Sequence, residues 1–145
     1  MNQNTLDLTL PRNCLCFNLR KIARLTTQIY TQHLKSVGLE GTQFTLLAAL
    51  KGKPGINMSE LATFLGMDRT TLPRSLKLIE KQGLVNIQVG QDRRQKVLFL
   101  SPAGQKKFEE AFPIWREAQQ MVIQKLGMDF SGSLIEQLNQ ATGKL

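Results

Sequence analysis

The sequence predicts a mainly α-helical fold with a small β-hairpin, and three observations support this fold class. Apolar residues recur at helical spacing near both ends of the chain, over residues 12–37 and 101–145. Between them, residues 57–82 hold two short helical patterns separated by a tight turn that contains glycine. Residues 85–100 then form two strand patterns around a charged loop. At 145 residues, the chain is expected to form about one domain, residues 1–145.

The first helix is expected over residues 12–37, because an apolar stripe continues to this point and Gly38 then ends it. The stripe consists of Leu15, Leu19, Ile22, Ile29 and Val37. A shorter apolar helix over residues 42–50 would brace this first helix against the unit that follows. His33 has no carboxylate or hydroxyl spaced to form a catalytic set with it, so we interpret it as an ordinary residue of an amphipathic helix.

Two closely spaced helices are expected next. Asn57 and Glu60 have the spacing of a capping box, which predicts a helix that begins directly after Asn57. Gly66 can adopt the left-handed conformation that ends a helix, and Asp68 is placed to cap the next helix. Helices joined by so short a turn must cross steeply, as in a helix-turn-helix.

The second helix of this pair has an apolar face and a basic face. The apolar face holds Leu72, Leu76 and Ile79, and the basic face holds Thr70, Arg74, Lys77 and Lys81. Arg69, Thr70 and Thr71 fall in its first turn, the part of a recognition helix that enters the major groove, where Arg can bind guanine through two hydrogen bonds. Pro73 lacks an N–H, and is expected either to bend the first turns or to be tolerated near the helix start. For an isolated helix, an ordinary solvated face would be the better interpretation.

The hairpin behind this helix favours a nucleic-acid partner. Residues 85–89 alternate apolar and polar side chains, residues 97–100 form a return strand, and the loop 90–96 between them is charged. Arginines in such a loop can enter the minor groove, where narrow A·T stretches concentrate negative potential. The helix pair and the hairpin therefore predict a winged helix-turn-helix DNA-binding core over residues 42–100. The residues expected to contact DNA are Arg69, Thr70, Thr71, Arg74, Lys77, Asp92, Arg93, Arg94 and Lys96.

The charge is unevenly distributed along the chain. The net charge is +8; residues 66–107 hold nine Lys or Arg and three Asp or Glu, which leaves +2 for all other residues. A basic surface of this kind binds polyanions by releasing counterions, so binding should weaken steeply with salt. Membrane surfaces are also polyanionic, but the sequence has no long apolar run, signal-peptide pattern or lipidation site. We therefore expect double-stranded DNA and not a membrane as the partner, and the cytoplasm as the compartment.

The end of the chain predicts two more helices. Ser101 and Pro102 form a typical helix start, and Pro113 is expected to kink the long helix that follows. That helix carries an apolar stripe of Phe108, Phe112, Trp115, Ala118, Val122 and Leu126. A last helix is expected after Gly127, and Ser133 and Glu136 have the spacing of a capping box in it. The terminal helices, residues 12–37 and 101–145, would leave their apolar stripes partly exposed in a monomer, so we expect them to be dimerisation helices of a homodimer.

Five motifs carry a resemblance to a known family. They are MSELA at 58–62, LGMDRTTL at 65–72, LIEKQGLV at 78–85, DRR at 92–94 and LSPAG at 100–104. With length and element order, they resemble the multiple-antibiotic-resistance regulator (MarR) family over essentially the whole chain. The resemblance implies a winged helix-turn-helix flanked by N- and C-terminal dimerisation helices, and a transcriptional repressor that reads a palindromic operator. It further implies a small apolar or phenolic effector bound in the crevice between the two parts.

The resemblance also implies individual roles. The position of Asp92 steadies the wing in that family, and the position of Arg94 approaches the minor groove. Pro73 replaces the hydroxyl residue that the family commonly carries there.

Cys14 and Cys16 allow more than one interpretation. A zinc site needs four ligands, and His33 is the only further soft ligand in the sequence, so no metal site is expected. On a helix, residues two apart point about 200° away from each other, so these two thiols would not bond to one another. On base rates they are two small buried apolar side chains.

A narrower resemblance favours a redox role for Cys16. Residues 15–19 (LCFNL) and Tyr30 resemble the organic-hydroperoxide-sensing branch of the same family, in which this cysteine is oxidised and tyrosines hydrogen-bond its sulfur. Fourteen residues of helix span about 21 Å, so Cys16 and Tyr30 could meet only across two first helices of a dimer. Where that branch carries further tyrosines, this chain has Arg20 and Gly41. Release from DNA by thiol oxidation, involving Cys16, Cys14 and Tyr30, is therefore an alternative to release by a ligand.

Other functional classes are less well supported. The sequence has no phosphate-binding loop, paired acids or nucleophile elbow, so neither an enzyme nor a cofactor is expected. The nearest enzymatic alternative is a thiol-based protein that consumes peroxide at Cys16. A winged-helix protein-interaction module whose hairpin binds an acidic partner is the other alternative, and the concentrated charge favours nucleic acid over it.

Overall fold

The computed structural model describes residues 6–145, which form six α-helices, two short 3-10 helices and a three-stranded antiparallel sheet. The α-helices are α1 (Leu15–Leu34), α2 (Gly41–Gly52), α3 (Met58–Leu65), α4 (Thr71–Lys81), α5 (Pro102–Leu126) and α6 (Met128–Thr142). The strands are β1 (Ile56–Asn57), β2 (Val85–Val89) and β3 (Lys96–Leu100), and the 3-10 helices are Pro11–Asn13 and Lys35–Val37. The predicted fold class, mainly α with a small β-wing, is confirmed.

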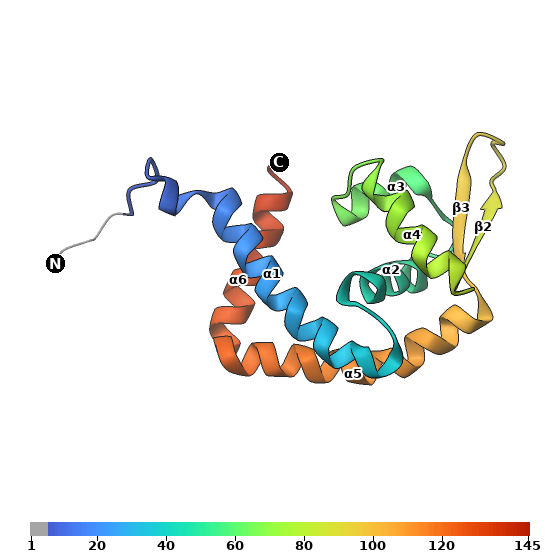
Figure 1. Cartoon of the computed structure of the whole chain (residues 1–145). Coiled ribbons are helices and arrows are strands. Elements are labelled where there is room, and N and C mark those ends of the chain that lie inside the picture. Colours follow the sequence, from blue (N-terminus) through green and yellow to red (C-terminus); the bar gives the residue numbers. More distant parts are fainter. Residues whose placement is uncertain (1–5) are drawn as a thin grey trace.

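The chain is arranged as two lobes joined by α5 (Figure 1). Helix α5 runs along one edge, where α1 and α2 pack against it. We call residues 41–100, from α2 to β3, the head, and the helices α1, α5 and α6 the base. Pro113 lies inside α5, as the sequence predicted, and the helix bends along its course (Figure 1).

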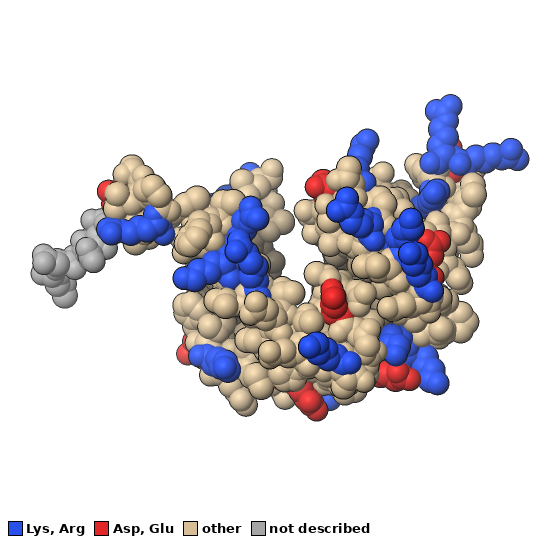
Figure 2. Space-filling model, viewed as in Figure 1, with Lys and Arg blue, Asp and Glu red and all other residues tan. Residues whose placement is uncertain are grey.

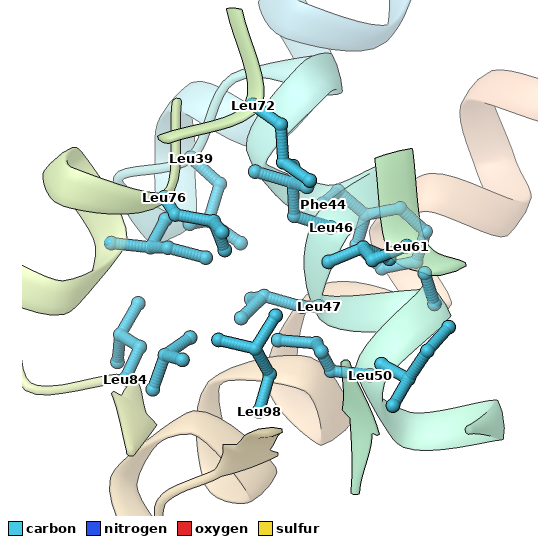
Figure 3. Packing of buried hydrophobic residues seen from close by; sticks show 14 of the residues in the cluster. Leu39, Phe44, Leu46, Leu47, Leu50, Leu61, Leu72, Leu76, Leu84 and Leu98 are labelled. Carbon is cyan, nitrogen blue, oxygen red and sulfur yellow. The ribbon is translucent and has the colours of Figure 1, made fainter. Parts of the chain in front are cut away.

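The head is built around a leucine-rich core. The nine largest fully buried side chains among the described residues are Leu34, Leu46, Leu47, Leu50, Leu61, Leu72, Leu76, Ile79 and Leu98. All but Leu34 belong to the head, and they converge from α2, α3, α4 and β3 (Figure 3). The apolar face predicted for α4 is therefore its core face, which fixes its opposite face toward solvent.

The sheet contains one strand that the sequence did not predict. β1 pairs antiparallel with β3, with Ile56 opposite Leu98 and Asn57 opposite Val97, so the strand order is β1-β3-β2. β2 pairs with the other edge of β3, from Val85 opposite Leu100 to Val89 opposite Lys96. The strand β1 ties the start of α3 to the hairpin, because Asn57 is both the last residue of β1 and the cap of α3.

The joint between head and base is held by the first turn of α5. The Ser101 hydroxyl donates to the Gly83 carbonyl at 2.5 Å and accepts from the Gly104 N–H at 3.0 Å. A Cβ atom on Gly104 would lie 1.9 Å from the carbonyl oxygen of Leu84. Only glycine therefore lets α5 start this close to the turn that follows α4.

One predicted helix cap is wrong. Ser133 and Glu136 do not form a capping box, because Ser133 lies inside α6 and its hydroxyl accepts from Gln137 at 3.0 Å. The helix begins five residues earlier, at Met128, directly after Gly127 breaks α5 with a φ of 90°. The glycine sets the boundary, and the Ser and Glu three residues apart are a coincidence of sequence.

The base leaves much of its apolar surface exposed. No residue of α6 is buried, and α1 buries only Leu34. Large apolar side chains of the base that are exposed include Leu15, Phe17, Leu19, Ile22, Leu25, Met128, Phe130, Ile135 and Leu138. Four of them, Leu19, Ile22, Ile135 and Leu138, line a hollow of about 480 Å³ between α1, α5 and α6.

Candidate nucleic-acid interface

The helix-turn-helix is formed by α3 and α4, and its turn is set by local hydrogen bonds. Asn57 Oδ1 accepts from the Glu60 N–H at 2.8 Å and the Glu60 side chain accepts from the Asn57 N–H, which confirms the predicted capping box. Gly66 ends α3 with a left-handed φ of 64°, as predicted. Asp68 Oδ1 then accepts from the backbone N–H groups of Thr70 and Thr71, at 3.0 and 2.7 Å.

These bonds correct the predicted start of α4. Arg69 and Thr70 lie in the turn before the helix and not in its first turn. Asp68 accepts hydrogen bonds from the amides of Thr70 and Thr71, and the helix begins at Thr71. The hydrogen bond from the Thr71 amide, with those from the Thr70 amide and hydroxyl, lowers the pKa of Asp68 to about 2. The turn that carries Arg69 is therefore fixed by an ionised carboxylate at neutral pH.

Pro73 is accommodated near the start of α4. It is the third residue of the helix, where a backbone N–H would have no partner within the helix. The missing donor therefore costs no helical hydrogen bond, and of the two expectations for Pro73, tolerance is the one consistent with this position.

The exposed face of α4 is basic and free of ion pairs. Arg74, Lys77 and Lys81 are exposed on the helix, and Arg69 is exposed in the turn before it. Within residues 6–145, none of these side chains lies within ion-pair distance of a carboxylate. Figure 2 shows basic side chains gathered over this part of the head. Their charges remain available for an anionic partner.

The wing presents two arginines at its tip. Asp92 Oδ1 accepts from the Arg94 N–H at 3.0 Å, and the Asp92 carbonyl accepts from the Gln95 N–H at 2.9 Å. Arg93 and Arg94 are both exposed, and basic side chains extend well beyond the rest of the wing (Figure 2). Lys96 was predicted in the loop, but it is the first residue of β3 and pairs with Val89.

The nine residues predicted to contact DNA all lie on the exposed surface of α4, its preceding turn or the wing. They come from two segments, residues 69–77 and 92–96, that the sheet and the core hold on one head. Asp68 was predicted as a cap, and it accepts from the amides two and three residues further on, as a capping side chain does, although α4 begins only at Thr71.

A crevice of about 220 Å³ lies where the head meets the base, between α1, α2 and α5. Threonines from α1 and α2 line it with two aromatic rings: Thr26, Thr27, Thr42, Thr45, Tyr30 and Trp115. Among the residues that the structure describes, no charged side chain lines the crevice. The Trp115 ring also stacks on Phe44 of α2, with centroids 5.5 Å apart. The sequence showed the aromatic stripe of α5, but not that the stripe joins head and base.

The structure contradicts one of the two interpretations of the cysteines. Cys14 and Cys16 are both exposed, so the expectation of two buried side chains is wrong for the described chain. The physical reason is that the start of α1 extends past its neighbours, as the exposure of Leu15 and Phe17 shows. Cys14 also lies before the helix with an extended backbone, so the angle between two helical residues does not apply to this pair.

Tyr30 already has a partner within the chain. Its hydroxyl donates to Gln119 Oε1 of α5, and burial raises the pKa of Tyr30 above its ordinary value. Tyr30 therefore stays protonated and joins α1 to α5. Within one chain it is not brought to Cys16.

Two further observations concern other kinds of site. Among residues 6–145, no three His, Cys, Asp or Glu side chains come together as metal ligands. No helix in that part of the chain combines the length and the apolar character that crossing a bilayer requires.

A helix-turn-helix with a basic outer face, followed by an arginine-tipped wing, defines a winged-helix transcriptional regulator. A sequence profile of the MarR family matches residues 37–95. The chain belongs to the MarR family, whose members are transcriptional regulators and not enzymes.

Individual relatives agree with this assignment. The chain is 28% identical over 96 residues to the uncharacterized HTH-type transcriptional regulator YwoH of Bacillus subtilis, covering 66% of this chain and 70% of YwoH. It is 36% identical to the M. tuberculosis transcriptional regulator MosR, solved in complex with DNA, with a TM-score of 0.79 over 90% of this chain and 97% of MosR. The transcriptional repressor CouR, solved on a 23-mer DNA duplex, is 25% identical, with a TM-score of 0.80 over 94% of this chain and 97% of CouR.

Proposed function

We propose that this MarR-family regulator binds double-stranded DNA as a homodimer and represses transcription from a palindromic operator. The observation that carries the proposal is the basic surface shared by α4 and the wing, whose charges have no ion-pair partner among residues 6–145. MosR and CouR, which share the fold, were solved bound to DNA, and CouR is a repressor. Both facts support duplex DNA over an acidic protein as the partner.

Each predicted contact has a role in this proposal. Arg69 and Thr70 read base edges from the turn before α4, and Thr71 reads them from its first residue, at the end of a recognition helix that enters the major groove. Arg74, Lys77 and Lys96 bind phosphates, which position the head without reading sequence. Arg93 and Arg94 enter the minor groove, and Asp92 positions Arg94 through its backbone amide.

The homodimer is supported by the exposed apolar surface of the base. A second copy that packs on α1, α5 and α6 would cover the hollow of about 480 Å³ and the side chains around it. Residues 12–37 and 101–145 would then be the dimerisation helices of a single domain that spans residues 1–145, with residues 42–100 as the winged helix-turn-helix. A two-fold dimer places two heads to meet successive major grooves, which are about 34 Å apart.

Release from DNA by a small apolar or phenolic effector is assigned to the crevice between α1, α2 and α5. The hollow in the base is larger, but the second copy would fill it, whereas the crevice touches both head and base. A ligand that stacks on Trp115 there favours one angle between head and base, and so changes the spacing of the two heads. The absence of charged lining residues favours a neutral ligand over a carboxylate.

Thiol oxidation is the second candidate for release, and the exposure of Cys16 favours it. An organic hydroperoxide would oxidise the thiol to a sulfenic acid and leave as the alcohol. Cumene hydroperoxide should weaken DNA binding by the wild type and by Cys14→Ser, and leave Cys16→Ser unaffected. Equal responses of wild type and Cys16→Ser would exclude this route.

The DNA-binding proposal is tested with a 30-base-pair duplex recovered by selection from a random library. Fluorescence anisotropy should show a fall in affinity of at least about thirtyfold for Arg69→Ala and for Arg94→Ala, since a contact of this kind contributes about 1–3 kcal/mol and each substitution removes two from the dimer. Arg116→Ala, an exposed arginine of α5, is the matched control and should bind as the wild type does. If all three variants bind equally well, the surface of α4 and the wing is not the DNA-binding surface.

A further inference from the structure

The helix α1 carries a second concentration of positive charge. Between Asp7 and Glu40 the sequence contains five Lys or Arg and no acidic residue. Residues 8–39 therefore carry a net charge of +5, although the net charge outside residues 66–107 is only +2. The acidic residues outside 66–107 do not fall between Asp7 and Glu40. This charge lies outside the head, and most of it lies on a helix of the base.

Three of these residues form one face of the helix. We call Arg20, Lys21 and Arg24 the α1 basic face. At about 100° per residue they lie within an arc of about 100° on α1, centred about 150° away from the residues that line the hollow of the base. A second copy packed on that hollow would therefore leave the α1 basic face uncovered.

The α1 basic face is available for a partner. All three side chains are exposed, and within residues 6–145 none is within ion-pair distance of a carboxylate. Figure 2 shows basic side chains on the lobe that contains α1, separated by an open notch from those over the head. Exposed cations without local neutralisation raise the potential toward any anion that approaches.

The position of α1 relative to the head indicates which anion this is. The first half of α1 rises from α5 toward the same side of the molecule as α3, α4 and the tip of the wing (Figure 1). A duplex that lies across the head on this side extends toward the lobe of α1. A second copy that packs on the hollow of the base, which α1 lines, would bring the two α1 helices close to the two-fold axis, between the two heads.

We propose that the α1 basic face binds phosphate groups at the centre of the operator, between the two segments that the heads contact. This inference rests on the proposed function, since it takes the DNA-bound homodimer as its frame. Such contacts add affinity and salt dependence without reading bases. The dimer would then contact three stretches of the DNA backbone. Each head contacts one of the outer stretches, and the α1 helices of both copies contact the central one.

The test compares two variants that each remove two positive charges per chain. Arg20→Gln/Arg24→Gln removes them from the α1 basic face, and Arg116→Gln/Lys125→Gln removes them from two exposed positions of α5. The affinity for the selected 30-base-pair duplex is measured by anisotropy from low to high salt. Loss of four phosphate contacts per dimer reduces the slope of log K against log salt by about 3.6. The α5 variant should keep the slope of the wild type.

Arg20→Lys/Arg24→Lys keeps the charges and should restore most of the slope, and thermal unfolding shows that all variants are folded. If Arg20→Gln/Arg24→Gln keeps the wild-type slope, the α1 inference is wrong while the proposed function stands. If the wild type itself shows no salt-dependent DNA binding, both are wrong. Binding of vesicles containing phosphatidylglycerol that the α1 variant alone loses, with an unchanged slope on DNA, would assign the face to a membrane and overturn the inference.

Discussion

The head and the base differ in how they use their apolar side chains. In the head, leucines from three helices and a strand are fully buried among themselves. In the base, no residue of α6 is buried, and from the start of α1 to its middle Leu15, Leu19, Ile22 and Leu25 are exposed. The difference indicates that the head folds on its own core, whereas the base is half of a structure that a second copy completes.

The largest expected effect comes from breaking the base. Ile22→Asp places a charge on the apolar surface that a second copy would cover, and burying an unpaired carboxylate there is strongly unfavourable. The variant should be monomeric in sedimentation experiments. Its affinity for the selected duplex should fall at least about a hundredfold, because one head alone makes half of the contacts.

A charge on an exposed residue outside that surface is the control for this prediction. Gln28→Asp, also exposed on α1 but not among the residues that line the hollow, should stay dimeric. A dimeric Ile22→Asp would mean that the base has another role.

The next prediction separates the two regions by their dependence on protein concentration. Leu47→Ala empties a fully buried site in the head and should destabilise the protein by about 2–5 kcal/mol. Leu19→Ala, in the base, should instead weaken dimerisation, and its melting temperature should recover as protein concentration rises. Thermal unfolding at several protein concentrations measures the melting temperatures of both variants. If the melting temperature of Leu19→Ala is lowered equally at all concentrations, the base does not depend on a second copy in this way.

The joint between the regions gives a smaller effect. Gly104→Ala forces a methyl group against the Leu84 carbonyl and should cost about 1–3 kcal/mol, because either α5 or the turn must shift. Gly132→Ala in α6 is the matched control, since its Cβ would meet open space. It should stabilise the protein by about 0.5–1 kcal/mol, as alanine does in a helix. Denaturant unfolding of the two variants checks the sign of each change.

The smallest effect is a pH dependence of the turn before α4. Hydrogen bonds lower the pKa of Asp68 to about 2 in the folded protein, from an ordinary value of 3.8. The stabilisation of the folded protein by the ionised Asp68 carboxylate is therefore complete above about pH 4 and is lost as the pH falls toward 2. At pH 5 the wild type should have a higher melting temperature than Asp68→Asn. The two melting temperatures should converge near pH 2. A constant difference over this range would mean that the carboxylate charge does not stabilise the turn.

The sequence predicted those parts of the fold whose cause is local. The capping box of Asn57 and Glu60, the stop at Gly66 and the core face of α4 each depend on residues within a few turns of one another. These predictions are confirmed because the caps and the apolar spacing lead to the same structure. The DNA-contacting candidates were found for the same reason, since the core face of α4 determines its outer face.

The parts that the sequence did not predict depend on distant residues. The two-residue strand β1 exists because β3 lies beside it, and so short a segment shows no alternation. The capping box predicted at Ser133 and Glu136 does not form, because both residues already lie inside the helix that begins after Gly127. The exposure of Cys14 and Cys16, and the α1 basic face, depend on which surfaces other elements leave uncovered. Average charge along the sequence cannot show that.

The central claim, that two heads held by one base read two halves of a site, is tested most directly by cutting the site in half. The selected duplex and a duplex with one half replaced by unrelated sequence are titrated at the same salt concentration, with stoichiometry from sedimentation. The account predicts two chains on the intact site and an affinity at least about a hundredfold higher than for the half-site. One chain per duplex, with equal affinity for both, would contradict it.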